Sequence, residues 1–156
     1  IKEGLKSIRI LLNLIKRTYL QLGLHPRELF IASGLIVQAL SLVKLARERR
    51  IQVVHGAWCT WPGYTAWIIS RLEPSIRFTL ACNAYDYDAH SPLTELIIED
   101  ADLVFTHARS RQQQVKDVWP QTNRPVVCVY RGTALPKVKP TDNASRSGLL
   151  CVGSLV

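Results

Sequence analysis

The most constraining feature of this sequence is the regular alternation, from residue 51 onward, of short apolar runs with segments of helical periodicity. Four β-branched apolar runs are typical of buried parallel strands, at residues 51–55, 76–82, 101–106 and 126–130. Three segments of helical spacing lie between them, at residues 64–72, 91–100 and 110–119. Strands that alternate with helices predict a parallel sheet with right-handed crossovers, and therefore a Rossmann-like α/β fold with flanking helices.

Two helices are predicted before this alternation begins. Residues 1–22 carry apolar side chains at helical spacing, and Gly23 and Pro26 follow as termination signals. Residues 28–50 read as a second helix with cations in its last turns, where they suit the helix dipole. No uninterrupted apolar run of 18 or more residues occurs, so no membrane-spanning helix is predicted.

The positive charge is concentrated in this helical part. The net charge is +8, of which residues 1–50 contribute +7 through ten Lys and Arg against three Glu. Two interpretations stay open: an ordinary packed helix pair with a solvated basic face, or a surface that docks on anionic lipid. Nucleic-acid binding is not favoured, because aromatic and basic residues do not interleave and no recognition-helix or zinc-finger spacing occurs.

The cysteines are spread through the chain without any Cys-x-x-Cys spacing. The four are Cys59, Cys82, Cys128 and Cys151. Apolar surroundings favour buried free thiols in a reducing compartment, rather than a disulfide framework or a zinc site. The length of 156 residues suits one domain with a sizeable core.

Polar and aromatic residues gather where the first two predicted strands end. His55, Trp58 and Trp61 follow one strand, and Asn83 and Asp86 follow the next. The carboxyl ends of parallel strands form the ligand crevice of such folds, so these residues should line one edge of a cleft. Indole rings stack on sugars and also anchor at lipid headgroups, although filling the core is the ordinary alternative.

Other candidate groups carry weaker signals. Arg109 and Arg131 closely follow strand ends and could face phosphates, although solvated surface positions explain them equally well. Trp67 lies at a core-facing helical position and is predicted to be structural. His90 and His107 have no metal-ligand partner at a recognisable spacing, so no metal site is predicted.

The segments VHGAW, PGYTAW and NAYDYD together resemble the N-terminal domain of family-4 retaining glycosyltransferases of the GT-B fold. The first family histidine falls on His55 and the second on Ala57. A later family histidine falls on Asn83, and the threonine two residues before it falls on Ala81. Asp86 matches the family aspartate.

The resemblance continues along the chain and covers residues 35–156. The segment 99–106 resembles the family's next strand, and Arg131-Gly132 belongs to a segment that resembles its exit loop. It implies an N-terminal acceptor-side domain at 1–135, incomplete at its start, a linker at 136–147, and at 148–156 the first strand of a second domain. The sequence contains no Met, and an incomplete piece of a longer chain is expected.

The resemblance implies a transferase that moves a sugar from a nucleotide-sugar to a glycan or lipid-linked acceptor. Asp86 would be catalytic, while acceptor contacts would come from His55, Trp58, Trp61, Gly63 and Asn83. The cleft or its phosphate side would hold Arg109, Arg131 and Gly132. The principal donor groups would lie in the second domain, so this piece should be inactive alone. No metal or bound cofactor is implied.

The partners expected are the nucleotide-sugar, the acceptor and an anionic membrane surface met by residues 1–50. The expected location is the cytoplasm, peripheral at the inner face of the membrane. One alternative is a non-catalytic basic Rossmann-like module that binds membrane or a protein partner. Another is a different GT-B or nucleotide-sugar enzyme, such as an epimerase.

Overall fold

The computed structural model describes residues 2–83, 86, 91–120 and 124–130, with residues 2–6 described for their backbone only. The helices are α1 (Lys2–Leu22), α2 (Pro26–Glu48), α3 (Trp61–Leu72), α5 (Pro92–Ile98) and α6 (Arg109–Val118). The strands are β1 (Val53–Gly56), β2 (Arg77–Ala81), β3 (Leu103–Thr106) and β4 (Val126–Cys128). The predicted order of elements is confirmed within this part of the chain.

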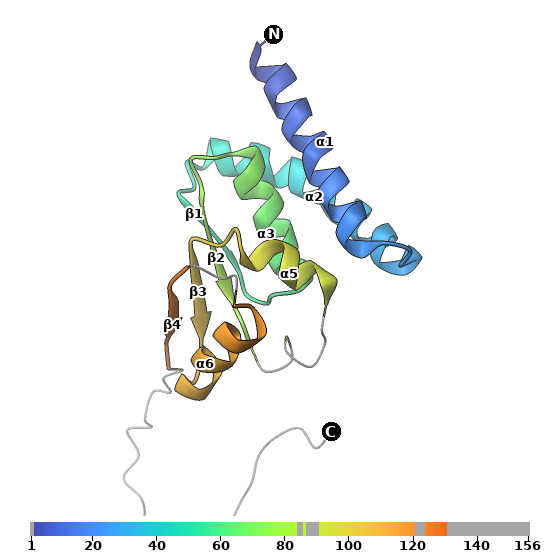
Figure 1. Ribbon diagram of the computed structural model, residues 1–156. Coiled ribbons are helices and arrows are strands. Elements are labelled where there is room, and N and C mark those ends of the chain that lie inside the picture. The colour runs from blue at the N-terminus through green and yellow to red at the C-terminus, as the bar shows by residue number, and fades with distance from the viewer. Residues whose placement is uncertain (1, 84–85, 87–90, 121–123, 131–156) are drawn as a thin grey trace, which may run out of the picture.

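The four strands form one parallel sheet in the order β1-β2-β3-β4, which confirms the Rossmann-like α/β class (Figure 1). The register places His55 beside Thr79 and Phe105 beside Val127. Each strand therefore pairs with its neighbours in sequence, and α3, α5 and α6 lie in the three successive crossovers. The carboxyl ends of all four strands lie at one edge of the sheet.

The two faces of this sheet differ in what covers them. Alternate residues of the strands, among them Phe78, Leu80 and Val104, are buried beneath α3, α5 and α6. On the opposite face Val53 and Val127 are 52% and 39% exposed, and none of the described helices covers them. Within the described residues, helices therefore cover only one face of the sheet. A sequential right-handed order places every crossover helix on the same face.

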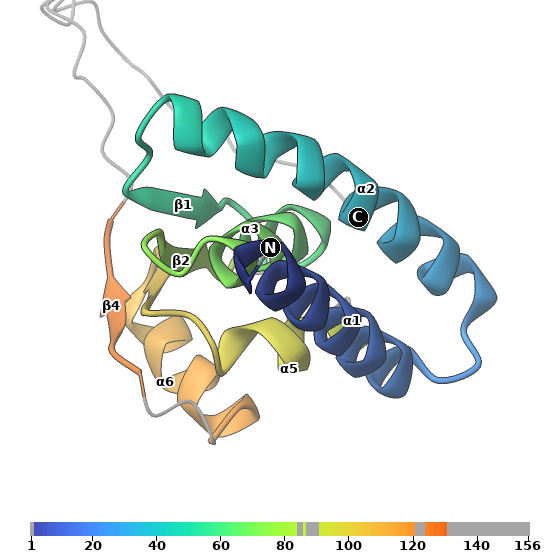
Figure 2. The same ribbon diagram turned by 90° about the horizontal axis from the view of Figure 1, so that it is seen from above.

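Helices α1 and α2 form a hairpin on the helical side of the molecule (Figure 2). α2 packs along α3, and α1 packs on α5, α3 and α2. The buried side of α2 is a stripe of small and branched apolar residues at helical spacing: Ala32, Ile36, Ala39, Val43 and Ala46. By length and composition α2 could cross a membrane. This is weak evidence for a span, because a helix packed in a domain passes the same test.

A polar cluster fixes α1 to the body of the domain. Asp100 accepts hydrogen bonds from Arg17 at 3.0 Å and from the indole of Trp67 at 2.8 Å, and it pairs with Arg71 at 2.8 Å. Trp67 is fully buried, as predicted, and the Arg17 guanidinium lies 5.4 Å from its ring centre. Beside it, burial raises the pKa of Tyr64 to about 12. This cluster joins segments far apart in the sequence.

Two sequence predictions need correction or lie outside the described residues. The predicted loop at 56–63 is shorter than expected, because α3 begins at Trp61 and takes Pro62 into its first turn. Proline suits that position, where its missing N–H would have no helical partner. The predicted linker at 136–147 and strand at 148–156 both fall outside the described residues.

Candidate functional site

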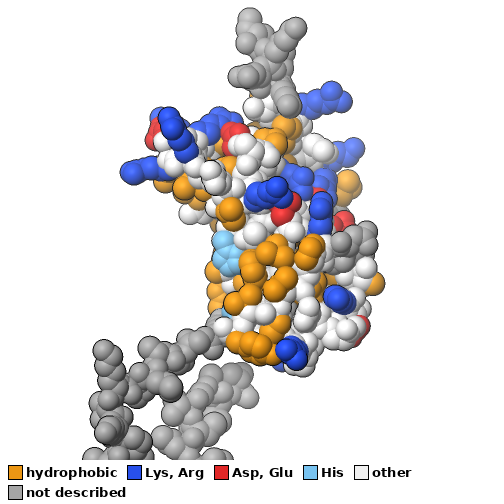
Figure 3. Space-filling model, turned by 90° about the vertical axis from the view of Figure 1, so that its left-hand side faces the viewer, with side chains coloured by type: hydrophobic (Ala, Val, Ile, Leu, Met, Phe, Trp, Pro, Cys, Tyr) orange, Lys and Arg blue, Asp and Glu red, His pale blue; other side chains and the backbone are white. Residues whose placement is uncertain are grey.

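An open pocket of about 550 Å³ lies on the uncovered face of the sheet, toward the carboxyl ends of the strands. Its lining residues come from strands or from positions just beyond them: His55, Ala57, Thr79, Ala81, Phe105, His107 and Val129. Figure 3 looks toward this side of the molecule and shows hydrophobic side chains gathered beside histidine, with Lys and Arg concentrated above. An apolar floor with a few polar groups is typical of small-molecule sites.

His55 is held in this pocket by two neighbouring strands. Its Nδ1 lies 2.9 Å from the Thr79 hydroxyl, its register partner on β2. Its ring meets Phe105 of β3 edge-on, with the ring centres 5.7 Å apart. Both contacts come from the same side of the edge strand β1, and the imidazole stays exposed to solvent. This arrangement leaves Nε2 as the ring nitrogen oriented for a ligand.

His107 is the second imidazole of the pocket. Its Nδ1 lies 3.0 Å from the carbonyl oxygen of Val129. Because a carbonyl only accepts, Nδ1 must carry the proton, and in the neutral ring Nε2 is then the acceptor. His55 and His107 therefore offer ring nitrogens from two strands to one pocket. Such groups can hydrogen-bond the hydroxyls of a polyol, or take up a proton from one.

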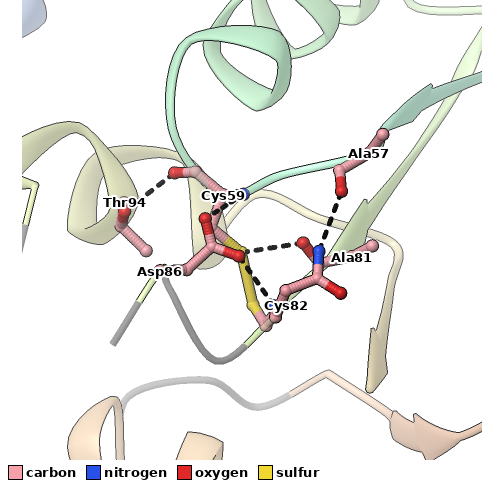
Figure 4. Close-up of a disulfide and its surroundings, with 7 residues drawn as sticks. Ala57, Cys59, Ala81, Cys82, Asp86 and Thr94 are labelled. Carbon is pink, nitrogen blue, oxygen red and sulfur yellow. Dashed lines mark hydrogen bonds between the residues drawn. A yellow bond between two sulfur atoms is a disulfide. The ribbon is translucent and has the colours of Figure 1, made fainter. Parts of the chain in front are cut away.

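Asp86 is not among the lining residues of this pocket and lies beside Cys59 and Cys82 (Figure 4). Its side chain is completely buried and accepts the backbone N–H of Cys59 at 3.0 Å and that of Asn83 at 2.6 Å. Burial raises the pKa of the Asp86 carboxyl above its ordinary value, and the two backbone hydrogen bonds oppose that shift. In this position the carboxylate fastens the loop after β1 to the end of β2.

Asn83 joins the same two loops from the other side. Its amide nitrogen donates to the carbonyl of Ala57 at 3.0 Å, while Thr94 of α5 donates its hydroxyl proton to the carbonyl of Cys59 at 2.7 Å. The β1–α3 loop is therefore held by side chains from the segment after β2 and from α5. Asn83 reaches the pocket rim through Ala57, which itself lines the pocket.

Cys59 and Cys82 form a disulfide within this cluster, with their Cα atoms 5.5 Å apart. The prediction that all the cysteines are free thiols is therefore wrong for these two. They meet because each residue follows a strand end, and β1 and β2 are neighbours in the sheet. Cys128 is a free, half-buried cysteine, and Cys151 lies outside the described residues.

The remaining acceptor candidates separate into two groups. Trp58 is 41% exposed on the β1–α3 loop. Trp61 is half-buried and lines a different pocket of about 420 Å³, next to His25 and Arg27 at the start of α2. The loop between Ala57 and Trp61 lies between the two pockets, so the predicted residues share an edge of the sheet but not one cavity.

Gly63 has a packing role in this structure. A Cβ atom on Gly63 would lie 2.6 Å from the carbonyl oxygen of Trp58 and 2.7 Å from a methyl group of Leu80. A Cβ on Gly56 would meet the Cα of Gly63 at 2.6 Å. The two glycines therefore allow α3 to approach β1 closely, which explains the residue type without any bound anion.

Of the cationic candidates, the structure describes only Arg109. Arg109 is exposed at the first position of α6. Arg131 and Gly132 fall outside the described residues. No group of three or more His, Cys, Asp or Glu side chains able to hold a metal ion occurs among the residues that the structure describes.

Two residues of the pocket escaped the sequence analysis as parts of a site. Thr79 lies within a predicted strand, and nothing in its own neighbourhood marks it as the partner of His55. Only the strand register could have identified it. His107 directly follows the predicted strand 101–106, so the rule that singled out His55 at the end of an earlier strand could have found it.

Comparison of the chain with protein-family models, with curated proteins and with solved structures finds no match. The class of protein that the fold defines is thus a Rossmann-like α/β domain. What the pocket binds has to be argued from its own residues.

Proposed function

We propose that this chain is the acceptor-side half of a retaining glycosyltransferase. The complete enzyme would transfer a sugar from a nucleotide-sugar to a glycan or lipid-linked acceptor, with the donor held by a second domain. No metal or bound cofactor is part of the proposal. The sequence resemblance to family-4 enzymes suggests the reaction class, and the open pocket at the carboxyl edge of the sheet supports the acceptor role.

The observation that carries the proposal is the pair of oriented imidazoles in this pocket. His55 and His107 offer ring nitrogens over an apolar floor that includes Phe105. Sugars present hydroxyl groups at their rim and apolar C–H faces, and this pocket offers partners for both. An open, two-sided site also suits a cleft that a second domain would complete.

Within this proposal His55 is the principal acceptor contact and Asp86 supports the site. The Asp86 carboxylate is buried and bonded to two backbone amides. It is therefore better suited to hold the loop that carries Asn83 than to exchange a proton with an acceptor. A catalytic role for Asp86 would require its carboxylate to leave those amides during the reaction.

The test is nucleotide release from nucleotide-sugars by the protein joined to its donor domain, with membrane lipid extract as the acceptor source. His55→Ala should abolish acceptor-dependent release, whereas Asp117→Ala, on the exposed side of α6 and outside both pockets, should retain it. The present chain alone should release nothing. Release by this chain alone, or full activity of His55→Ala, would contradict the proposal.

A second candidate function is a non-catalytic module that binds a membrane or a protein partner. This function is favoured because Asp86 does not line the 550 Å³ pocket, and the described lining of that pocket contains no carboxylate. This function predicts no nucleotide release with any donor, while binding through the basic helical part persists. The same assay therefore separates the two.

The location that accompanies the proposal is the cytoplasmic face of a membrane. The disulfide between Cys59 and Cys82 argues against that location, because stable disulfides are typical of oxidising compartments. The redox state of these two cysteines in cells is therefore a direct check on it.

A further inference from the structure

The turn between α1 and α2 carries the most exposed large apolar side chains of the described residues. Leu24 is 99% exposed, Phe30 82% and Leu20 73%, and Tyr19 beside them is half-exposed. We call these four residues the hairpin tip. They lie within twelve positions of one another in the sequence, and Gly23 makes the turn with a positive φ of 55°. Four large apolar side chains exposed within so short a segment are a candidate interaction surface.

The hairpin tip is not needed to bury the core. The opposite sides of the same helices supply the packing residues, such as Leu14 and Leu22 on α1 and Ala32 and Ile36 on α2. Figures 1 and 2, which view the molecule at right angles, both show the turn projecting from the body of the domain. A projecting apolar tip can insert into a membrane or a partner protein without disturbing the fold.

The charge around the tip indicates which of these surfaces it contacts. Lys16 and Arg27 are exposed beside the tip, and residues 1–50 carry a net charge of +7. A lipid surface rich in anionic headgroups attracts nearby Lys and Arg side chains. A second copy of this chain would instead bring another charge of +8 to the same place. Charge complementarity therefore favours anionic lipid over self-association.

The apolar residues supply the other part of the interaction. Transfer of a leucine or phenylalanine side chain out of water is favourable. Helices that lie at a membrane interface combine such side chains with flanking cations. Between Glu28 and Lys44, α2 contains no charged residue, and Val37 on its exposed side is 66% exposed. The apolar surface thus continues from the tip along α2.

We propose that the hairpin tip inserts into the headgroup region of an anionic phospholipid bilayer and docks the domain on it. The 420 Å³ pocket shares His25 and Arg27 with the base of the tip and contains Trp61. A docked domain would hold that pocket at headgroup level. If the proposed glycosyltransferase function holds, a lipid-linked acceptor would reach Trp61 from the membrane, and this last step alone rests on that function.

The experiment is flotation of the whole chain with vesicles of phosphatidylcholine, with and without phosphatidylglycerol. Binding should require phosphatidylglycerol and weaken as salt is raised. Leu24→Glu and Phe30→Glu should each lower the affinity by roughly tenfold or more, because each removes an inserting side chain and adds a repelled charge. Arg27→Gln should weaken binding by a smaller factor.

Val118→Glu is the matched control, because Val118 is 41% exposed on α6, away from the tip. It adds the same charge to the same chain and should bind nearly as well as the unmodified protein. Circular dichroism should show all variants folded, since the substituted side chains lie at the surface.

Equal binding of Leu24→Glu and Val118→Glu would overturn the proposal, since net charge alone would then explain the affinity. Absence of binding to either vesicle would overturn it as well. If sedimentation then showed that the unmodified protein is a dimer and Leu24→Glu a monomer, the tip would be a contact between two copies of the chain. Vesicle binding needs no sugar transfer, so this proposal can fail or succeed independently of the proposed function.

Discussion

Asp86 is a buried side chain that holds two loops of the site in place without lining the pocket. Its two oxygens accept the amides of Cys59 and Asn83, so the carboxylate replaces solvent for two loop backbones. Burial nevertheless dominates and raises the pKa of Asp86. The protonated carboxyl is therefore favoured in the folded state more than in the unfolded chain.

This has a consequence for the pH dependence of stability. A raised folded-state pKa gives a contribution that is present below the ordinary aspartate pKa and is lost as pH rises through the raised value. We therefore expect the free energy of unfolding of the unmodified protein, minus that of Asp86→Asn, to be larger in acid than at neutral pH. Urea unfolding at several pH values measures this difference.

Asp117→Asn provides the control, because it removes a carboxylate from the exposed side of α6. Its difference from the unmodified protein should change little by comparison. If the Asp86→Asn difference instead grew toward neutral pH, the backbone hydrogen bonds would outweigh burial, and the inference about the pKa of Asp86 would be wrong.

At the scale of elements, the contact between β1 and α3 depends on two glycines. Gly63→Ala should lower the free energy of unfolding by about 1 to 3 kcal/mol, because the added methyl meets a backbone carbonyl that has little room to move. The matched control is Gly34→Ala on the exposed side of α2, where a Cβ meets nothing within 4 Å. That change should stabilise by about 0.5 to 1 kcal/mol through helix propensity.

Denaturant unfolding of the two variants gives both values. The opposite signs are the expected result, since the amino-acid change is the same and only the surroundings differ. A neutral or stabilising Gly63→Ala would show that α3 can withdraw from β1 at little cost.

The docking of α1 depends on Asp100. Asp100→Ala should lower the free energy of unfolding by about 1 to 3 kcal/mol, because the buried Trp67 N–H loses its acceptor and two arginines lose their partner. Hydrogen exchange should accelerate in α1 more than in the sheet. Glu73→Ala is the control, because its partner Arg47 is 55% exposed and this single pair should contribute under about 1 kcal/mol.

A uniform acceleration of exchange after Asp100→Ala would mean that α1 does not open separately from the sheet. The expected contrast between α1 and the sheet thus tests whether the Asp100 cluster acts as a local attachment.

The sequence was sufficient for the elements and insufficient for the contacts between their ends. Periodicity changes at Gly23 and at Glu73-Pro74 located the helix ends, because these residues act locally. The helix predicted at 64–72 begins earlier, at Trp61, because Pro62 is compatible with a loop and also with the first turn of a helix. The pairing of Cys59 with Cys82, and of His55 with Thr79, depends on strand register, which no local pattern specifies. The uncovered sheet face likewise follows from strand order rather than from composition.

At the scale of the whole molecule, the disulfide closes the β1–α3–β2 unit. Cleavage by a thiol reductant should lower the stability by about 3 kcal/mol, because the unfolded chain regains the freedom of a loop 23 residues long. Alkylation in denaturant without reductant, followed by peptide mapping, should leave Cys59 and Cys82 joined and modify Cys128.

A Cys59→Ser, Cys82→Ser double variant is the control, and its stability should not respond to the reductant. Alkylation of both cysteines before any reduction would contradict the disulfide and restore the interpretation of buried free thiols.

The position of Asp100 also has a consequence for synthesis on the ribosome. Arg17 and Asp100 are 83 residues apart, and α1 also rests on α5, which is made almost as late. At about 5 to 20 residues per second, the nascent hairpin waits roughly ten seconds for its attachment. During that interval the apolar side of α1 lacks its partner α5, and a chaperone or a nearby bilayer is a surface that it can meet first.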